Sequence, residues 1–170
     1  MKSLETLALE WLRYRAGCVL LSEQRPIRYC GGVPDCVGVK PNRHWIEIEV
    51  KRSLQDFKSN ATKRHMVHRE RGVGYATRNG PRQFYFIVPH ALVEKVAPWL
   101  PAGAGLLRAP NAFEPEEAVV VKAAQFNPAA ERFPLKELSR ACRMQANEVL
   151  ALRNRVDQLK AKIGSMEGRP

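Results

Sequence analysis

The chain has 170 residues, of which 45% are hydrophobic and 26% are charged. This length allows one compact domain with an appendage and excludes two domains of ordinary size. Lys and Arg number 28 against 17 Asp and Glu, a net charge of +11. So basic a chain predicts a polyanionic partner, either nucleic acid or an acidic membrane surface.

No stretch approaches the roughly 18–20 consecutive apolar residues that a membrane span needs. The first seven residues also lack the apolar core of a signal peptide. The four cysteines, at positions 18, 30, 36 and 142, form no CxxC pair. We therefore expect reduced thiols, a cytoplasmic location and no membrane association.

The N-terminal region predicts an amphipathic helix followed by a strand. Apolar side chains recur at i, i+3 and i+4 spacing from Ser3 to Arg15, and Ser3 should be the N-cap. Gly17 should end this helix, and residues 18–21 should form a short strand.

Two further strands, Cys36–Lys40 and His44–Val50, flank a tight loop. Ser53 and Asp56 then match the S-x-x-[DE] capping box, which predicts a helix from Ser53 to about Arg71.

The next elements are a strand over Gln83–Val88, a helix from Pro89 to about Leu100, and strands over 105–108 and 118–122. The order of helix, strands, helix, strand, helix and strands indicates an α/β or α+β domain with a mixed sheet, spanning residues 1–126.

The C-terminal region has a different pattern. Residues 127–134 predict a linker, and residues 165–170 predict a frayed tail. Over 135–164, the a and d positions follow 4-3 spacing for four heptads, with Val or Ile at a and Leu at d in the second half. Cys142 at a and Gln145 at d weaken the pattern in the first half. This favours a parallel two-stranded coiled coil, and hence a homodimer through this helix. A single amphipathic helix folded back onto the domain is the alternative.

The predicted hairpin carries the most informative residues. If residues 41–43 form a three-residue loop, paired residue numbers sum to 84, and Asp35 lies opposite Glu49 with Cβ atoms about 4.5–5.5 Å apart. Two carboxylates so close repel unless a cation lies between them, and Mg²⁺ or Mn²⁺ prefers oxygen ligands. Lys51, on the same face, can stabilise charge on an attacking hydroxide or a phosphate oxygen.

Strand alternation alone also fits a solvated face on which these acids and Lys51 pair with one another. The Pro-Asp pair before the first strand, the register and the basic helix that follows favour the catalytic interpretation.

Pro34-Asp35 followed by Glu49-Val50-Lys51 resembles the PD-(D/E)XK nuclease signature. The resemblance continues through the Gly72–Gly74, Phe84–Pro89 and Gly103–Leu107 segments. Together these look like small phage and prophage members of that superfamily, and like bacterial DNA-repair-associated relatives.

The resemblance covers roughly residues 1–124 and implies a restriction-endonuclease-like mixed sheet flanked by helices. It further implies a metal-dependent nuclease that cleaves DNA. Asp35 and Glu49 would bind Mg²⁺ or Mn²⁺, with the Val50 carbonyl as a third ligand, and Lys51 would orient or activate the water.

Members of this family often contribute a further acid. Glu10 and Glu23 are the candidates here, with Glu5 behind them, although each also fits an ordinary exposed acid. Glu47 should face the site as an additional or supporting ligand. Asp56 is explained by the capping box and is assigned no catalytic role.

A basic track begins beside the candidate site. Lys and Arg along the predicted helix and the loop after it would contact backbone phosphates without reading sequence. The residues assigned to this track are Arg52, Lys58, Lys63, Arg64, Arg69, Arg71 and Arg78.

Two other functions are compatible with the sequence. One is a nucleic-acid-binding protein that keeps the nuclease fold without turnover. The other is a phage-encoded protein whose coiled coil and basic surface engage an acidic host partner.

Overall fold

The computed structural model describes residues 2–23, 33–59 and 80–167. The chain divides into two units, Met1–Phe133 and Pro134–Pro170. The first unit confirms the predicted α/β class with a mixed sheet. Within the described residues, no helix is long and apolar enough to cross a membrane.

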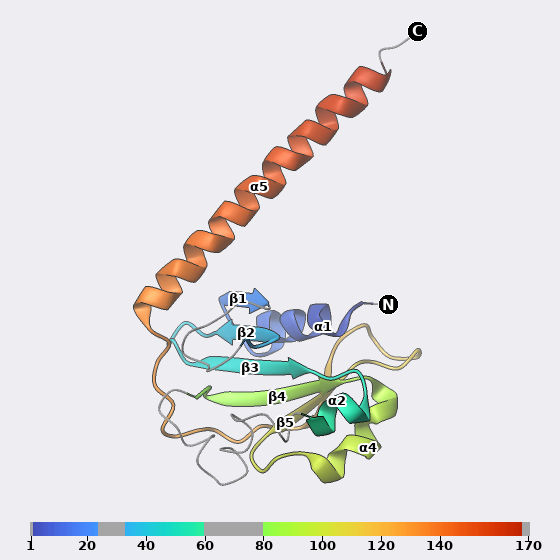
Figure 1. The fold of residues 1–170 in the computed structure, drawn as a ribbon, viewed down its shortest axis with the longest axis vertical. Helices are drawn as coiled ribbons and strands as arrows, with labels where there is room; N and C mark the ends of the chain where they lie inside the picture. Colours follow the sequence, from blue (N-terminus) through green and yellow to red (C-terminus); the bar gives the residue numbers. More distant parts are fainter. Residues whose placement is uncertain (1, 24–32, 60–79, 168–170) are drawn as a thin grey trace. The chain divides into compact units, whose positions relative to one another are not determined.

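The first unit is built on one six-stranded sheet whose spatial order follows the chain order (Figure 1). The pairings of β3 with β4 and of β4 with β5 are parallel, and the other three pairings are antiparallel. The strands are β1 (Leu20–Glu23), β2 (Cys36–Val39), β3 (Trp45–Val50), β4 (Gln83–Val88), β5 (Gly105–Arg108) and β6 (Val119–Lys122).

The first helix begins where the sequence predicts. Helix α1 (Leu4–Glu10) continues as a π-helical turn, Trp11–Arg15, and the Ser3 hydroxyl accepts a hydrogen bond from the Thr6 N–H at 3.1 Å. Gly17 follows with φ of 72°, a left-handed conformation in which glycine has no steric cost. The strand predicted at 18–21 begins two residues later, as β1. Cys18 is not part of it, because its N–H donates a hydrogen bond back to the Leu12 carbonyl at 2.9 Å.

The structure describes the first turns of one predicted helix and divides another into three short elements. Helix α2 is described over Leu54–Ser59, and the rest of the predicted helix to Arg71 lies outside the described residues. The helix predicted from Pro89 consists of a 3₁₀ turn (His90–Leu92), helix α4 (Val93–Val96) and a second 3₁₀ turn (Ala97–Trp99). Pro98 cannot donate a helical hydrogen bond, which explains the break.

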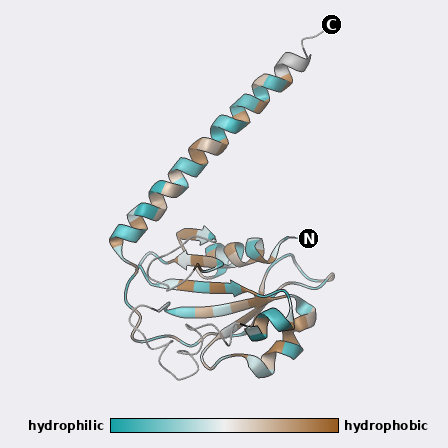
Figure 2. Cartoon of the chain, viewed as in Figure 1, coloured by the Kyte–Doolittle hydropathy of each residue, from teal (hydrophilic) through white to brown (hydrophobic). Residues whose placement is uncertain are grey.

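Apolar side chains cover both faces of the sheet. On β3, Ile46, Ile48 and Val50 belong to a core with α1 residues such as Leu7. On the opposite face, Phe84, Phe86 and Leu106 form a second core with Phe57 of α2 and Val96 of α4. Figure 2 shows hydrophobic residues alternating with hydrophilic ones along β3. Glu47 and Glu49 therefore belong to the face that carries α2 and α4.

The hairpin register is the one that the sequence predicts. Cys36 pairs with Ile48 and Val39 pairs with Trp45, so paired numbers sum to 84. The turn is closed by a 2.8 Å hydrogen bond from the Lys40 N–H to the His44 carbonyl. This register brings the residues just before β2 alongside the end of β3.

Residues 127–133, predicted as part of a linker, belong to the first unit instead. Phe133 is 2% exposed, its ring centroid is 6.0 Å from that of Trp45, and its N–H donates to the Arg43 carbonyl at 2.7 Å. Asn127 is also 2% exposed. An aromatic anchor and backbone hydrogen bonds thus hold a segment whose composition suggests a free linker.

The second unit consists mainly of helix α5 (Leu135–Glu167), which contains the helix predicted over 135–164. The helix continues three residues into the predicted tail. In the single chain, the a and d residues of its second half are exposed: Val149, Leu152, Val156, Leu159 and Ile163.

The loop between β5 and β6 contains an ion pair that should make stability depend on pH. The Arg108 guanidinium donates to both oxygens of Glu114, with the Nη2–Oε1 distance at 2.6 Å, and the Asn111 N–H adds a 3.0 Å hydrogen bond. These contacts, Arg108 first, lower the pKa of Glu114 to about 2. Because the folded pKa lies below the unfolded value near 4.5, this stabilisation is present above pH 4.5 and disappears as the pH falls toward 2.

We therefore expect Glu114→Gln to lower the thermal unfolding midpoint at pH 7 and to have no effect near pH 2. Calorimetry at several pH values measures this difference. Glu94→Gln, at an exposed acid on α4, is the matched control. A destabilisation by Glu114→Gln that is equally large at pH 7 and pH 2 would refute the ion-pair explanation.

Candidate functional site

The candidate site lies at the end of the hairpin where β3 leaves the β2–β3 pairing. Extending the observed register by one pair from Cys36–Ile48 places Asp35 opposite Glu49. The Asp35 side chain also reaches β3 directly, since its Oδ2 accepts a hydrogen bond from the Val50 N–H at 2.8 Å. The sequence prediction that Asp35 and the end of β3 come together is thus supported by a specific contact.

Glu49 and Lys51 form a buried ion pair beside Asp35. Glu49 is 6% exposed and Lys51 is 3% exposed, and the Lys51 Nζ lies 3.3 Å from Glu49 Oε2. Alternation along the strand places both side chains on the same face. Burying an ammonium group is costly unless carboxylates surround it. The pairing therefore holds the Lys51 charge in a defined position.

Asp56 is a second partner of Lys51, and sequence reasoning assigned it only to the capping box. Half of that box is present, because the Ser53 hydroxyl accepts from the Asp56 N–H at 3.1 Å. The Asp56 carboxylate, however, lies 3.9 Å from the Lys51 Nζ. The five-residue spacing between Lys51 and Asp56, across the start of α2, is the only sequence feature that indicates this contact.

Glu5 is the acid of the first helix that comes nearest to these residues. It is 8% exposed and forms an ion pair with Arg52, the residue after Lys51. Burial alone would raise the pKa of Glu5, but the hydrogen bond from its own N–H and the contact with Arg52 outweigh burial and lower the pKa. Sequence reasoning ranked Glu5 behind two other acids.

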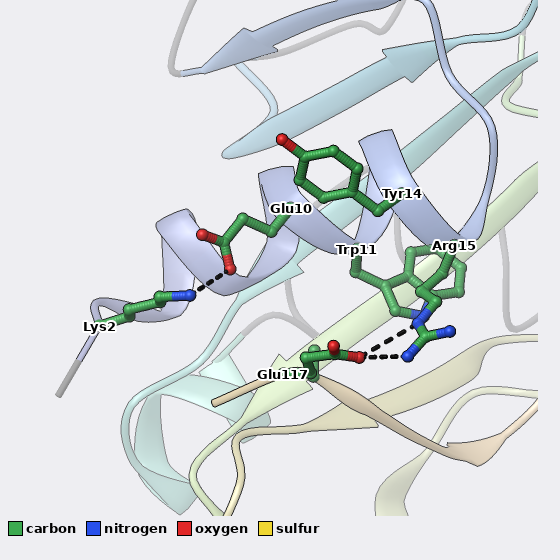
Figure 3. A pocket seen from close by; sticks show the side chains of 7 residues that line it. Lys2, Glu10, Trp11, Tyr14, Arg15 and Glu117 are labelled. Carbon is green, nitrogen blue, oxygen red and sulfur yellow. Dashed lines mark hydrogen bonds and ion pairs between the residues drawn. The ribbon is translucent and has the colours of Figure 1, made fainter. Parts of the chain in front are cut away.

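Glu10, a candidate for the additional acid, lies on another face of α1 than Glu5 and has other partners. Five residues correspond to about 500° of helix rotation, so Glu10 emerges about 140° away from Glu5. Its carboxylate accepts a 2.9 Å hydrogen bond from the Lys2 Nζ. It lines a separate cavity of about 410 Å³ with Trp11, Tyr14, Arg15 and Glu117 (Figure 3).

Glu23 and Glu47 lie closer to the predicted site. Glu23 ends β1 directly opposite Cys36, the neighbour of Asp35. Glu47 is 4% exposed and lies one alternation before Glu49 on the same face. Glu23 thus lies at the same end of the sheet as Asp35, whereas Glu47 lies further along β3 toward the hairpin turn.

The buried Cys36 thiol reports how these acids are grouped. Its pKa is raised well above its ordinary value, first by burial and then by four negative charges. The carboxylates responsible come from α1, β1, the start of β2 and β3: Glu5, Glu23, Asp35 and Glu49. Acids from four segments of the chain therefore gather at one end of the sheet.

Of the residues assigned to the basic track, the structure describes two. Arg52 is bound to Glu5, and the Lys58 ammonium lies 3.9 Å from the centroid of the Trp99 ring. The others lie outside the described residues: Lys63, Arg64, Arg69, Arg71 and Arg78.

The donors suit a hard divalent cation. Asp35 and Glu49 supply carboxylate oxygens, and the Val50 carbonyl lies between Glu49 and Lys51 in the chain. Among the described residues, no three His, Cys, Asp or Glu side chains converge on one metal position. Asp35, Glu49 and Asp56 carry three negative charges against the one positive charge of Lys51, which leaves a formal charge of −2 for a divalent cation to neutralise.

Comparison with known proteins adds little to this description. No protein-family model and no curated protein matches the sequence. Among solved structures, a protein of unknown function from Silicibacter pomeroyi is similar, with a TM-score of 0.48 and 23% identity over 96% of this chain and 92% of that one. The functional conclusion therefore depends on the residues of the chain itself.

Proposed function

We propose that the protein is a metal-dependent nuclease of the PD-(D/E)XK type that hydrolyses phosphodiester bonds in DNA, in phage DNA metabolism or repair. The observation that carries this proposal is the joining of Asp35, Glu49 and Lys51 at the end of β3, through the Asp35–Val50 hydrogen bond and the buried Glu49–Lys51 pair. The strand order also suits a restriction-endonuclease-like fold, since an antiparallel hairpin is followed by a parallel strand after α2.

Asp35, Glu49 and the Val50 carbonyl would hold Mg²⁺ or Mn²⁺. When bound, such an ion supplies a water of lowered pKa and neutralises charge on the phosphate. Asp35 is positioned for this role by the Val50 N–H, which holds one of its two oxygens. Glu49 is positioned by the strand and by Lys51.

Lys51 would donate a hydrogen bond to the attacking water or to a phosphate oxygen. Its ammonium is held between Glu49 and Asp56 at 3.3 and 3.9 Å, so it does not have to be ordered when substrate arrives. Preorganised donors of this kind stabilise developing negative charge more effectively than donors in water. Asp56 would act as a positioning residue that orients the Lys51 ammonium.

Metal binding can be tested apart from catalysis. We expect the wild type to bind Mn²⁺ and Asp35→Asn to bind it more than tenfold more weakly, because the substitution removes an anionic ligand. An asparagine oxygen can still accept the Val50 hydrogen bond, so the fold should be preserved. Isothermal titration measures the affinity, and Glu10→Gln serves as a control at an acid outside the site. Equal Mn²⁺ affinity in Asp35→Asn and wild type would rule out this metal site.

The activity itself is tested with labelled substrates in Mg²⁺, Mn²⁺ or EDTA. The panel should contain single-stranded, duplex and branched DNA, with RNA alongside. Cleavage that requires metal supports the proposal. Binding of these substrates without cleavage under any metal would instead favour a nucleic-acid-binding protein that retains the nuclease fold.

A further inference from the structure

A second cavity, of about 270 Å³, lies at the other end of β3, beside the hairpin turn. Its lining comes from three segments that are distant in sequence. The turn provides Lys40, Asn42 and His44, the start of β4 provides Arg82 and Gln83, and the segment after β6 provides Phe126. Ile46 also lines it, so the cavity is on the α1 face of the sheet, opposite to Glu49.

This cavity is positively charged. Lys40 and Arg82 line it, and Arg132 is close enough to act on the neighbouring His44. The pKa of His44 is lowered first by burial and then by these three cations. The residues described in its lining include no Asp or Glu. An anion placed here would relieve the mutual repulsion of the cations.

An exposed aromatic ring stands beside these charges. Phe126 is 64% exposed, and the Arg82 guanidinium carbon lies 5.3 Å from the centroid of its ring. Proteins that bind single-stranded nucleic acid combine exposed aromatic rings with neighbouring cations. The ring stacks on a base while the cations contact phosphates.

Hydrogen bonds hold the cavity walls in place. Arg82 Nη1 donates to the Asn127 carbonyl at 2.7 Å, and the Asn127 N–H donates to the Arg82 carbonyl at 2.9 Å. The Asn127 amide also donates to the Pro81 carbonyl at 3.3 Å, and the His44 N–H donates to Asn42 Oδ1 at 3.0 Å. Phe126 and Arg82 are therefore positioned before any ligand binds, which reduces the entropic cost of binding.

We propose that this cavity is a subsite for single-stranded nucleic acid, in which Lys40, Arg82 and Arg132 contact a phosphate and Phe126 stacks on the adjoining base. The subsite deepens the proposed nuclease function but uses none of the residues assigned to catalysis. It lies at the opposite end of β3 from Lys51, seven residues and roughly 23 Å along the strand direction. Binding and hydrolysis can therefore be separated by mutation.

The first test is the affinity of the full-length protein for a fluorescent oligothymidylate in EDTA, measured by anisotropy across a salt series. Phe126→Ala should weaken binding at least fivefold, the lower end of the range for loss of one stacked base. Lys40→Ala should reduce the slope of log affinity against log salt by about 0.7, the value for one phosphate contact on a single strand. Lys95→Ala, at an exposed lysine on α4, should change neither quantity.

An abasic oligonucleotide of the same length distinguishes stacking from charge alone. Wild type should bind the abasic strand at least fivefold more weakly than oligothymidylate, and Phe126→Ala should bind the two equally. Phe126→Tyr, which keeps an aromatic ring, should restore the preference. Equal wild-type affinity for the two strands, or unchanged binding in both Phe126→Ala and Lys40→Ala, would overturn the proposed subsite.

The outcomes also separate this inference from the proposed function. If wild type cleaves DNA and the subsite variants bind as wild type does, the subsite is refuted while the nuclease proposal stands. If the variants lose affinity as expected although no metal supports cleavage, the subsite stands and the nuclease proposal fails.

Discussion

Replacing Lys51 with alanine is expected to slow metal-dependent DNA cleavage by about 10²–10³-fold, the effect of removing one preorganised donor that stabilises developing negative charge. The Lys51 ammonium is 3.3 Å from Glu49 and 3.9 Å from Asp56, and its residue is 3% exposed. A charge that is so buried and has two carboxylate partners does not belong to a solvated strand face. Single-turnover cleavage at saturating protein measures the chemical step without the contribution of binding.

The same substitution should also affect stability, and this must be separated from catalysis. Removing one partner of a buried ion pair leaves the other charge uncompensated, at a cost of about 3–5 kcal/mol. The double variant Glu49→Gln/Lys51→Met removes both charges and should recover most of the lost stability, because no buried charge is left without its partner. It should remain inactive, since it lacks both a metal ligand and the donor.

Lys51→Arg is the matched control for charge. It keeps a positive group near Glu49 but changes the shape and position of the donor, so we expect partial stability and reduced cleavage. Wild-type cleavage rates in Lys51→Ala would exclude Lys51 from the chemistry. Loss of cleavage in all variants in proportion to their unfolding would indicate a purely structural ion pair.

Local patterns predicted much of the sheet. Strands Gln83–Val88 and Gly105–Arg108 have the bounds expected from their composition, and the register of β2 with β3 follows from the loop at 41–43. These features depend on turn length and on alternation with a period of two, and both can be recognised from residues that are close in the sequence. The contact between Asp35 and the end of β3 was predictable for the same reason.

The parts that sequence reasoning missed depend on contacts between distant segments. The contact of Glu5, and not of Glu10, with Arg52 depends on how α1 is rotated against the sheet. Asp56 satisfies a local motif, and nothing in that motif shows that its carboxylate is near Lys51. Phe133 joins the first unit through Trp45, a ring contact over 88 residues of chain that composition cannot reveal.

The C-terminal helix carries an apolar stripe that is exposed in the single chain. In the single chain the exposed fractions of Leu152 and Leu159 are 60% and 52%, and those of Val149, Val156 and Ile163 lie between 47% and 63%. A stripe with 4-3 spacing over four heptads is typical of a helix that packs against a second copy of itself. Glu148 at g would attract Arg153 at e of the partner, whereas Arg155 at g would repel Lys160 at e.

We therefore expect full-length protein to dimerise and Leu152→Glu to weaken the dimer at least 100-fold, because it removes a d-position leucine and places a charge in the interface of both helices. Leu150→Glu is the matched control, since Leu150 is 57% exposed but lies at b, outside the stripe. Sedimentation velocity over a concentration series measures both, and the dimer should tighten with salt as the Arg155–Lys160 repulsion is screened.

A chain ending at Pro134 should run as a monomer. If the full-length chain is also monomeric at micromolar concentration, the coiled-coil prediction is wrong and the stripe is covered in another way, such as by folding back onto the first unit.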